Sequence, residues 1–337
     1  QPLTLLPLSL SRAGVTTDPD GRSVITLRFE CGQLADWSSI DLSRIPLYLN
    51  ADAPLACALH EALTLSVAKT GIRFPGDTDR RALDARFAVC GFGQEETLLP
   101  ESGSFSGYRL LLEYFTFREK FMAVSLRGLE NVAFPEDMSW FEIDVVLNKQ
   151  WSHEFPFSEK HLRLHCAPVI NLFPLESDPL HLDSLQTEYL LRPMRIQDGH
   201  TEIYSVDSVT SSRHSGHQVW VPFTSFRHKG GMMRHDAPEY YYHTRVKRGP
   251  SGLHYTWLIL GGEAFDNHTV PDDEKLSLSL TGTNGQLPRR ALQSTLLDTV
   301  VKSTASRIRV RNLCAPTLPC YPPDQDRFHW RVLDRKS

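Results

Sequence analysis

Histidine is the residue type in this sequence with the clearest capacity for chemistry, because imidazole ligates metals and transfers protons near neutral pH. Six histidines fall within residues 200–243: His200, His214, His217, His228, His235 and His243. His214 and His217 are close enough for one turn to present both to a metal ion. A zinc site needs a third protein ligand with supporting groups, and the usual zinc-enzyme motifs do not accompany these histidines. We interpret them as loop and strand residues, with a β-sandwich metal-dependent hydrolase as the alternative.

The other motifs that could support catalysis are incomplete. The sequence has no G-x-S-x-G nucleophile elbow, and its nearest approach, residues 103–107, is typical of a helix start. The stretch Gly282-Thr-Asn-Gly285 follows a strand pattern but lacks the lysine of a phosphate-binding loop, which favours a tight turn. We predict that the chain is not an enzyme and has no catalytic residue, no bound metal and no cofactor.

Charge and cysteine content narrow the class of protein. The formal net charge of −4 does not favour nucleic-acid binding through a general basic field. No run approaches the roughly 20 apolar residues that span a bilayer, so we expect no membrane insertion. None of the six cysteines forms a C-x-x-C motif, and most lie in apolar runs, which indicates a reduced, cytoplasmic protein. A pairing of Cys314 with Cys320 stays open.

Alternation of apolar and polar residues predicts that strands dominate the chain. The clearest examples are residues 25–29, 141–147, 162–166 and 276–280, with a further strand-like run at 308–311. The length of 337 residues exceeds what one hydrophobic core usually serves. We therefore predict a mainly β fold with a few helices, in two β-sandwich-like domains, residues 1–166 and 167–337. The long loops are expected at residues 131–140, 167–182, 225–238 and 312–324.

Helical spacing is confined to three places, which follow Pro54, Ser106 and Pro288. The second is the strongest, because Ser106 is a suitable N-cap and apolar residues recur at i, i+3, i+4 and i+7. These residues are Tyr108, Leu111, Leu112 and Phe115. We expect this stripe to pack in the core, with Arg109 and Glu113 forming an i,i+4 ion pair on the same helix.

Longer strings of sequence carry more information than periodicity. VCGFGQEETLLP at residues 89–100 leads into FSGYRLLLEYFTFREKF at residues 105–121, and CAPVINLF follows at residues 166–173. This order closely resembles the TssF family, also called VasA or ImpG, of type VI secretion systems. The family usually has proline where this chain has Arg118. Further matching strings stand at residues 188–193, 202–209, 280–288, 311–323 and 328–331.

The resemblance implies a structural role. TssF proteins resemble the wedge proteins of contractile phage baseplates, and with TssG and a second TssF copy they form a wedge to which TssK and TssE attach. Wedges assemble in the bacterial cytoplasm around the VgrG spike and dock on the inner-membrane complex. There they nucleate and trigger the contractile sheath. The family is longer than this chain at both ends, so we expect a fragment without the N-terminal region and the extreme C-terminus.

Assembly of this kind requires protein–protein interfaces, which are enriched in exposed aromatic residues. We place the candidate interface in the loops at residues 167–182 and 312–330. The residues concerned are Asn171, Phe173, Tyr321, Phe328 and Trp330. The alternative is that these aromatic residues pack the two domains against each other.

Overall fold

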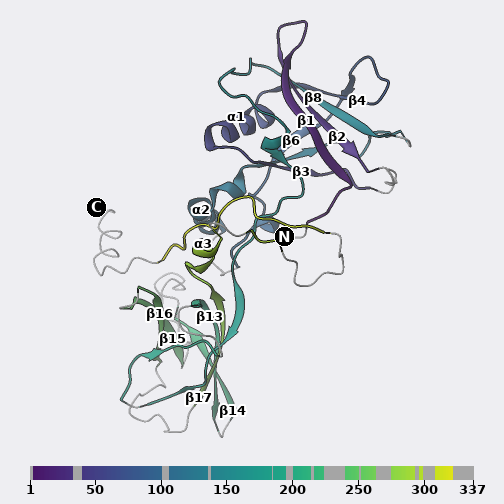
Figure 1. The fold of residues 1–337 in the computed structure, drawn as a ribbon. Coiled ribbons are helices and arrows are strands. Elements are labelled where there is room, and N and C mark those ends of the chain that lie inside the picture. The colour runs from purple at the N-terminus through teal and green to yellow at the C-terminus, as the bar shows by residue number, and fades with distance from the viewer. Residues whose placement is uncertain are drawn as a thin grey trace, which may run out of the picture. The chain divides into compact units, whose positions relative to one another are not determined.

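The structure of the chain is a computed structural model in which strands dominate (Figure 1). It divides into two compact units, residues 1–170 and residues 171–337, and each is treated separately below. The residues that it describes are 3–32, 40–100, 106–135, 138–183, 185–194, 200–213, 216–223, 240–249, 252–262, 275–292, 296–298 and 308–321. Within these residues, no helix is both long enough and apolar enough to cross a membrane.

The first unit contains two antiparallel sheets. The larger has the strand order β1 (Leu8–Thr17), β2 (Ser23–Cys31), β8 (Trp140–Leu147), β4 (Val67–Arg73) and β5 (Arg81–Leu83). The smaller has the order β6 (Arg86–Val89), β7 (Ala123–Arg127), β3 (Ile45–Leu49) and β9 (Leu162–Arg163). Short 3₁₀ turns also occur, at η1 (Gln94–Glu96), η2 (Arg118–Phe121) and η3 (Glu159–His161).

The core of this unit follows from the two-residue period of its strands. Ile25, Leu27 and Phe29 of β2 are fully buried, and Phe29 stacks on Phe141 of β8 with ring centroids 5.0 Å apart. The intervening positions of β8 are acidic, and Asp144 is buried against two arginines. Its Oδ2 lies 3.1 Å from Nε of Arg73 and 3.0 Å from Nε of Arg80. Alternation therefore separates the apolar core from an ion-paired polar face.

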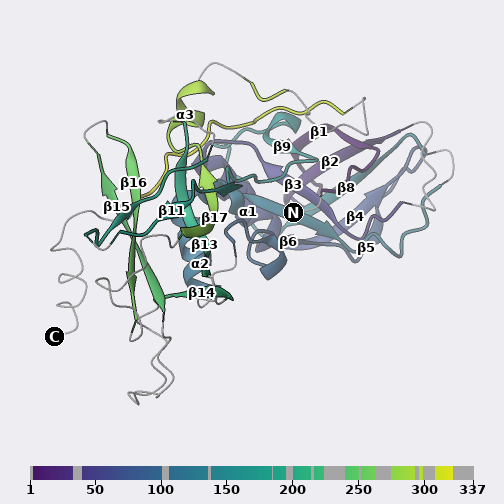
Figure 2. The ribbon, with the colours of Figure 1, turned by 90° about the horizontal axis from the view of Figure 1, so that it is seen from below.

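Helix α1 (Ala53–Thr64) covers the smaller sheet and contacts β3, β6 and β7 (Figures 1 and 2). Asp52 caps its N-terminus, because the Asp52 side chain accepts a hydrogen bond of 3.3 Å from the Leu55 N–H. The buried side of the helix is apolar throughout. It consists of Leu55, Ala56, Leu59, Ala62 and Leu63. This is the ordinary arrangement of an amphipathic helix on a sheet.

The second unit is built on one eight-stranded sheet. Its order is β10 (Phe173–Glu176), β17 (Lys275–Thr283), β13 (Glu202–Arg213), β14 (Gly216–Pro222), β15 (Tyr241–Arg248), β16 (His254–Gly261) and β12 (Tyr189–Leu190), with β11 (Leu180–His181) also paired to β17. The residues of its core include Val209, Trp220, Tyr242, Leu258 and Leu276. Helix α3 (Leu287–Ala291) follows the turn after β17.

The mainly β fold and the three helix positions predicted from the sequence are confirmed. Three local predictions are wrong. The strand at residues 162–166 ends at Arg163, because His165 adopts a left-handed backbone with φ 57°. The loop at residues 167–182 contains β10 and β11, which gain order from pairing with β17. No strand forms at residues 308–311. The predicted loop at residues 225–238 lies outside the described residues.

Candidate protein–protein interface

Helix α2 (Ser106–Thr116) presents its apolar stripe to solvent. Tyr108, Leu111, Leu112 and Phe115 are 66%, 55%, 58% and 79% exposed. The prediction that this stripe packs in the core is therefore wrong. The helix has the sequence period of a core helix, but more than half of the surface of each of these four side chains is exposed. Contiguous exposed apolar patches often mark interaction sites, whereas single hydrophobic residues scattered over a surface do not.

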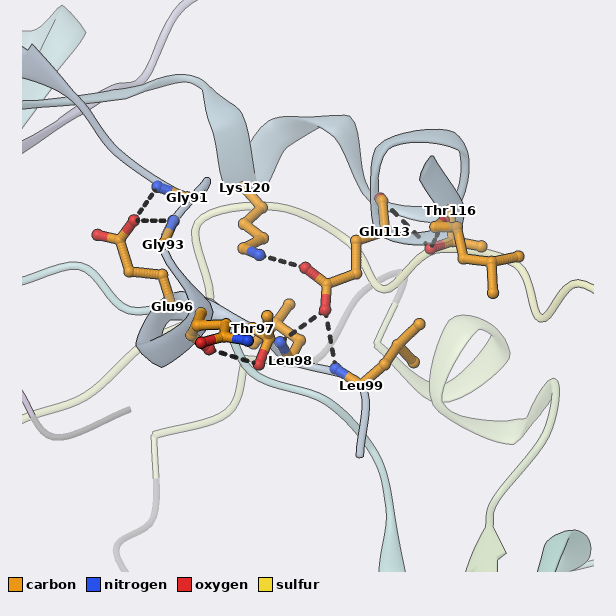
Figure 3. A network of polar contacts seen from close by, with 11 residues as sticks. Gly91, Gly93, Glu96, Thr97, Leu98, Leu99, Glu113, Thr116 and Lys120 are labelled. Carbon is orange, nitrogen blue, oxygen red and sulfur yellow. Dashed lines mark hydrogen bonds and ion pairs between the residues drawn. The ribbon is translucent and has the colours of Figure 1, made fainter. Parts of the chain in front are cut away.

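The one buried residue of α2 is Glu113, a carboxylate. Its Oε1 accepts hydrogen bonds from the backbone N–H groups of Leu98 (2.8 Å) and Leu99 (2.9 Å). Its Oε2 accepts from Nζ of Lys120, which is equally buried (Figure 3). The expected pairing of Glu113 with Arg109 is thus wrong. Lys120 is a better partner because η2 folds it back under the helix and shields it from water.

Burial and hydrogen bonding act in opposite directions on Glu113. Burial raises the pKa of its carboxyl group, whereas hydrogen bonds from Lys120, Leu99 and Leu98 lower it. The hydrogen bonds together outweigh burial, so the pKa lies below its ordinary value. The group is therefore charged at neutral pH. A buried ion pair needs further hydrogen bonds to offset the loss of hydration, and the carboxylate of Glu113 accepts two from the backbone N–H groups of Leu98 and Leu99. Rotating α2 to bury its leucines would break this network, so the network fixes the apolar stripe outward.

The loop before α2 is held by a second carboxylate. Oε2 of Glu96 accepts from the backbone N–H groups of Gly91 (2.6 Å) and Gly93 (3.2 Å) (Figure 3). Its Oε1 pairs with Arg44. Burial raises the pKa of Glu96, and the bonds from Gly93, Gly91 and Arg44 bring it below its ordinary value. Gly91 has φ 92°, and a Cβ there would lie 3.2 Å from the Phe121 ring, so this position requires glycine.

Aromatic residues extend the apolar surface beyond the helix stripe. The Phe121 ring is buried, and its centroid lies 5.0 Å from that of Phe92 and 5.7 Å from that of Tyr114. Tyr114 in turn contacts Phe115 edge to face, with centroids 5.5 Å apart. Phe92 and Tyr114 are about half exposed. We call this exposed surface the α2 platform; it consists of Phe92, Tyr108, Leu111, Leu112, Tyr114 and Phe115.

The α2 platform is large enough to bind a protein. Its six side chains expose on the order of 700 Å² together, taking about 200 Å² for a large side chain. A standard protein interface buries about 800 Å² on each partner. The platform also has the composition of an interface centre, because four of its six residues are aromatic and none is charged. The sequence revealed the apolar stripe through its helical spacing, but that spacing does not tell whether the stripe packs within the protein or faces solvent.

Three of the residues predicted for an interface gather at one end of the paired strands β13 and β17 in the second unit. Oδ1 of Asn171 accepts from the Asn284 N–H (2.7 Å) and from the Thr283 hydroxyl (3.1 Å), which ties the start of β10 to the turn after β17. Phe173 is half-buried and lies opposite Gly282 in the β10–β17 pair. These contacts are structural. A role in binding a partner stays a prediction for both residues.

Tyr321 reaches the same end of these strands. Its hydroxyl donates to Oε2 of Glu202 (2.6 Å), and its ring stacks on His254 with centroids 3.5 Å apart. Burial raises the pKa of Tyr321, and the carboxylate of Glu202 raises it further. The tyrosine therefore remains protonated and anchors the chain segment around it to the sheet. Phe328 and Trp330 lie outside the described residues.

The histidine-rich segment is only partly described. His200 and His243 are exposed, and His214, His228 and His235 lie outside the described residues. In the part of the chain that the structure describes, no three histidine, cysteine or acidic side chains are grouped to hold a metal ion. Cys320 is a free thiol there, as are Cys57, Cys90 and Cys166, so the disulfide between Cys314 and Cys320 is not formed.

Comparison with known proteins gives a consistent result. The sequence profile of the family described as "Type VI secretion system, TssF" matches residues 1–335. The type VI secretion system component TssF1 of Pseudomonas aeruginosa strain PAO1 is 26% identical over 368 residues, which cover 100% of this chain and 58% of that protein.

Two solved structures are similar as well. A chain of the type VI secretion system TssK-TssF-TssG baseplate subcomplex, determined by cryo-electron microscopy, is 55% identical, with a TM-score of 0.82 over 99% of this chain and 61% of that chain. A chain of the baseplate complex from the type VI secretion system is 54% identical, with a TM-score of 0.62 over 97% of this chain and 56% of that chain. This chain thus spans about three-fifths of the length of the relatives that it matches.

Proposed function

Because this chain belongs to the TssF family of the type VI secretion system, we propose that it serves as a structural subunit of the secretion baseplate and not as an enzyme. The observation that carries the proposal is the 55% identity, over 99% of this chain, to a chain of the TssK-TssF-TssG baseplate subcomplex. Proteins this similar share their cores and most of their surfaces. The proposed direct partners are therefore TssG and TssK.

The finer parts of the proposal follow from the family resemblance. The protein assembles into a wedge that includes TssE and a second copy of itself, around the VgrG spike in the bacterial cytoplasm. Through the wedge it connects indirectly to the inner-membrane complex, and the assembled baseplate nucleates and triggers the sheath. The two units would act as rigid β scaffolds in this role, since both have well-buried apolar cores.

The α2 platform supports this proposal from the physical side. A scaffold subunit needs apolar surface that stays exposed until its partner binds, and it needs that surface to be held rigidly. The buried pair of Glu113 and Lys120 provides the rigidity, because it anchors the helix on the side away from the stripe. Little conformational entropy is then lost when a partner packs on the platform.

Reconstitution tests the proposed function. The full-length protein is co-expressed with TssG and TssK from the same bacterium, and the mixture is separated by size-exclusion chromatography with mass determination. We expect one complex that contains all three proteins. TssG and TssK expressed without this protein serve as the control. Elution of the folded full-length protein apart from both partners, at micromolar concentrations, would contradict the proposal.

A further inference from the structure

The residues of the α2 stripe have the spacing with which one helix packs against another. Tyr108, Leu112 and Phe115 are separated by four and then three residues, which is the alternation of core positions in paired helices. Leu111 widens the stripe on one side. The helix has 11 residues, so its exposed side is about 16 Å long and offers about three turns to a partner.

Arg109 lies beside this stripe, and its charge has no ion-pair partner among the described residues. Arg109 lies one helical turn from Leu112 and is half-buried. Its Nε is shielded from solvent and has no hydrogen-bond acceptor, and the described residues supply no ion-pair partner for its guanidinium group. A shielded donor without a partner costs about 1–3 kcal/mol, so a carboxylate brought to Arg109 by a binding partner would remove a cost already present in the free protein.

We propose that the α2 platform binds an amphipathic helix of a partner subunit, which packs its apolar face on Leu112 and Phe115 and pairs a carboxylate with Arg109. The inference rests on the proposed baseplate function and adds the binding surface and the kind of element that covers it. Helix-in-groove recognition of this type depends on apolar anchors at i, i+3 or i+4, and i+7. The charged pair would fix the register and direction of the bound helix.

The same charges argue against a second copy of α2 as the bound helix. Glu113 is the one carboxylate in the sequence of α2, and it is buried against Lys120. Two α2 helices packed on each other would leave both Arg109 side chains without a carboxylate from either helix. Like charges close together at an interface are unfavourable. The chemistry therefore favours a helix with its own acidic residue beside its apolar face.

Site-specific photo-cross-linking in the reconstituted complex tests the inference. The photoreactive residue p-benzoylphenylalanine replaces Phe115 in the full-length protein, and the cross-linked peptide is identified by mass spectrometry. Leu65 is the control position, because it is 76% exposed in the same unit but lies at the end of α1. We expect a cross-link from position 115, and not from position 65, to a partner segment with helical apolar spacing and an adjacent acidic residue.

The other outcomes of the cross-linking experiment distinguish failure of this inference from failure of the proposed function. An assembled complex whose position 115 cross-links to nothing, to a second copy, to its own chain or to a non-helical segment would overturn the inference and leave the baseplate function intact. A wild-type protein that forms no complex would contradict the proposed function, and the inference would fall with it.

A charge reversal tests the role of Arg109 separately. Arg109→Glu should weaken partner binding at least about tenfold, whereas Arg109→Met, which keeps the length of the side chain, should weaken it less. Exchanging the acidic residue identified by cross-linking for lysine should restore binding to the Arg109→Glu protein. Equal binding by the wild type, Arg109→Glu and Arg109→Met would show that Arg109 does not contact a carboxylate of the partner.

Discussion

Helices α1 and α2 belong to the same unit and have nearly the same length, 12 and 11 residues, but they are built in opposite ways. α1 buries leucines and alanines against the sheet and leaves its one charged residue, Glu61, in solvent. α2 buries a glutamate and leaves two of its three leucines and all its aromatic residues largely in solvent. A helix that only needs to be stable takes the first form. The second form fits the role that we propose for α2, in which its apolar side binds another protein.

The difference shows how one residue can decide the direction of a helix. Glu113 satisfies two backbone N–H groups of the loop before the helix and the ammonium group of Lys120. These bonds exist only when that side of α2 faces inward. The exposed stripe is thus a consequence of the buried ion pair. Substitutions of buried residues in α1 and α2 should therefore lower stability, whereas substitutions in the exposed stripe should weaken binding.

The largest effect is expected at the buried charge. Glu113→Gln leaves the Lys120 ammonium buried without a counter-charge, which should lower the free energy of unfolding by about 3–5 kcal/mol. The matched control is Glu61→Gln on α1, whose partner Lys149 is half exposed, and this change should cost less than about 1 kcal/mol. Urea denaturation followed by the fluorescence of tryptophan measures both. Equal losses would show that the pair does not hold α2.

A comparable effect is expected in the apolar core beneath α1. Leu59 is fully buried, so Leu59→Ala removes its packing and leaves a cavity, at a cost of about 2–5 kcal/mol. Urea denaturation measures the loss, and binding to TssG and TssK should be unchanged while the protein remains folded. A stability within 0.5 kcal/mol of the wild type would contradict the assignment of α1 to the core.

Acid should remove the contribution of the buried carboxylate of α2 to stability. The pKa of Glu113 lies below its ordinary value of 4.5, so the folded state binds its proton less readily than the unfolded state. The stability contributed by this group is fully present above about pH 4.5 and is lost as the pH falls through the folded-state pKa. The gap in unfolding free energy between wild type and Glu113→Gln should therefore narrow below pH 4.5. A gap that stays constant down to pH 2 would contradict this linkage.

The smallest effect on stability is expected on the α2 platform. Leu112→Ser changes a side chain that is 58% exposed, so the free energy of unfolding should stay within about 0.5 kcal/mol of the wild type. Binding of the partner should nevertheless weaken, because the serine removes an apolar anchor from the interface. A loss of stability as large as that of Leu59→Ala would mean that Leu112 already packs within the free protein.

The sequence predicted which segments form strands and helices better than it predicted what those segments contact. Alternation at residues 25–29 reports directly which side chains share a face of a strand, and both the strand and its buried residues were correct. The stripe on α2 was recognised, but its direction depends on Glu113, Leu98 and Lys120 meeting in space. Local spacing offered Arg109 as the partner of Glu113, and only the tertiary fold supplies Lys120.

Other errors have the same origin. β10 was taken for part of a loop because it lies in a long stretch that contains prolines, yet pairing with β17 orders it. The strand that begins at Leu162 ends early because His165 turns the backbone, and its Nε2 accepts a hydrogen bond of 3.2 Å from Leu6, which is distant in the sequence. The division into domains at residues 166 and 167, and the interface role of Asn171, Phe173 and Tyr321, stay predictions.

The most direct test of the α2 platform as an interface is hydroxyl-radical footprinting of the full-length protein, free and in complex with TssG and TssK. The oxidation rates of Tyr108, Leu112 and Phe115 are compared with that of Leu65. We predict that the three platform residues become strongly protected in the complex and that Leu65 does not. Unchanged oxidation of Leu112 and Phe115 in a fully assembled complex would contradict the account.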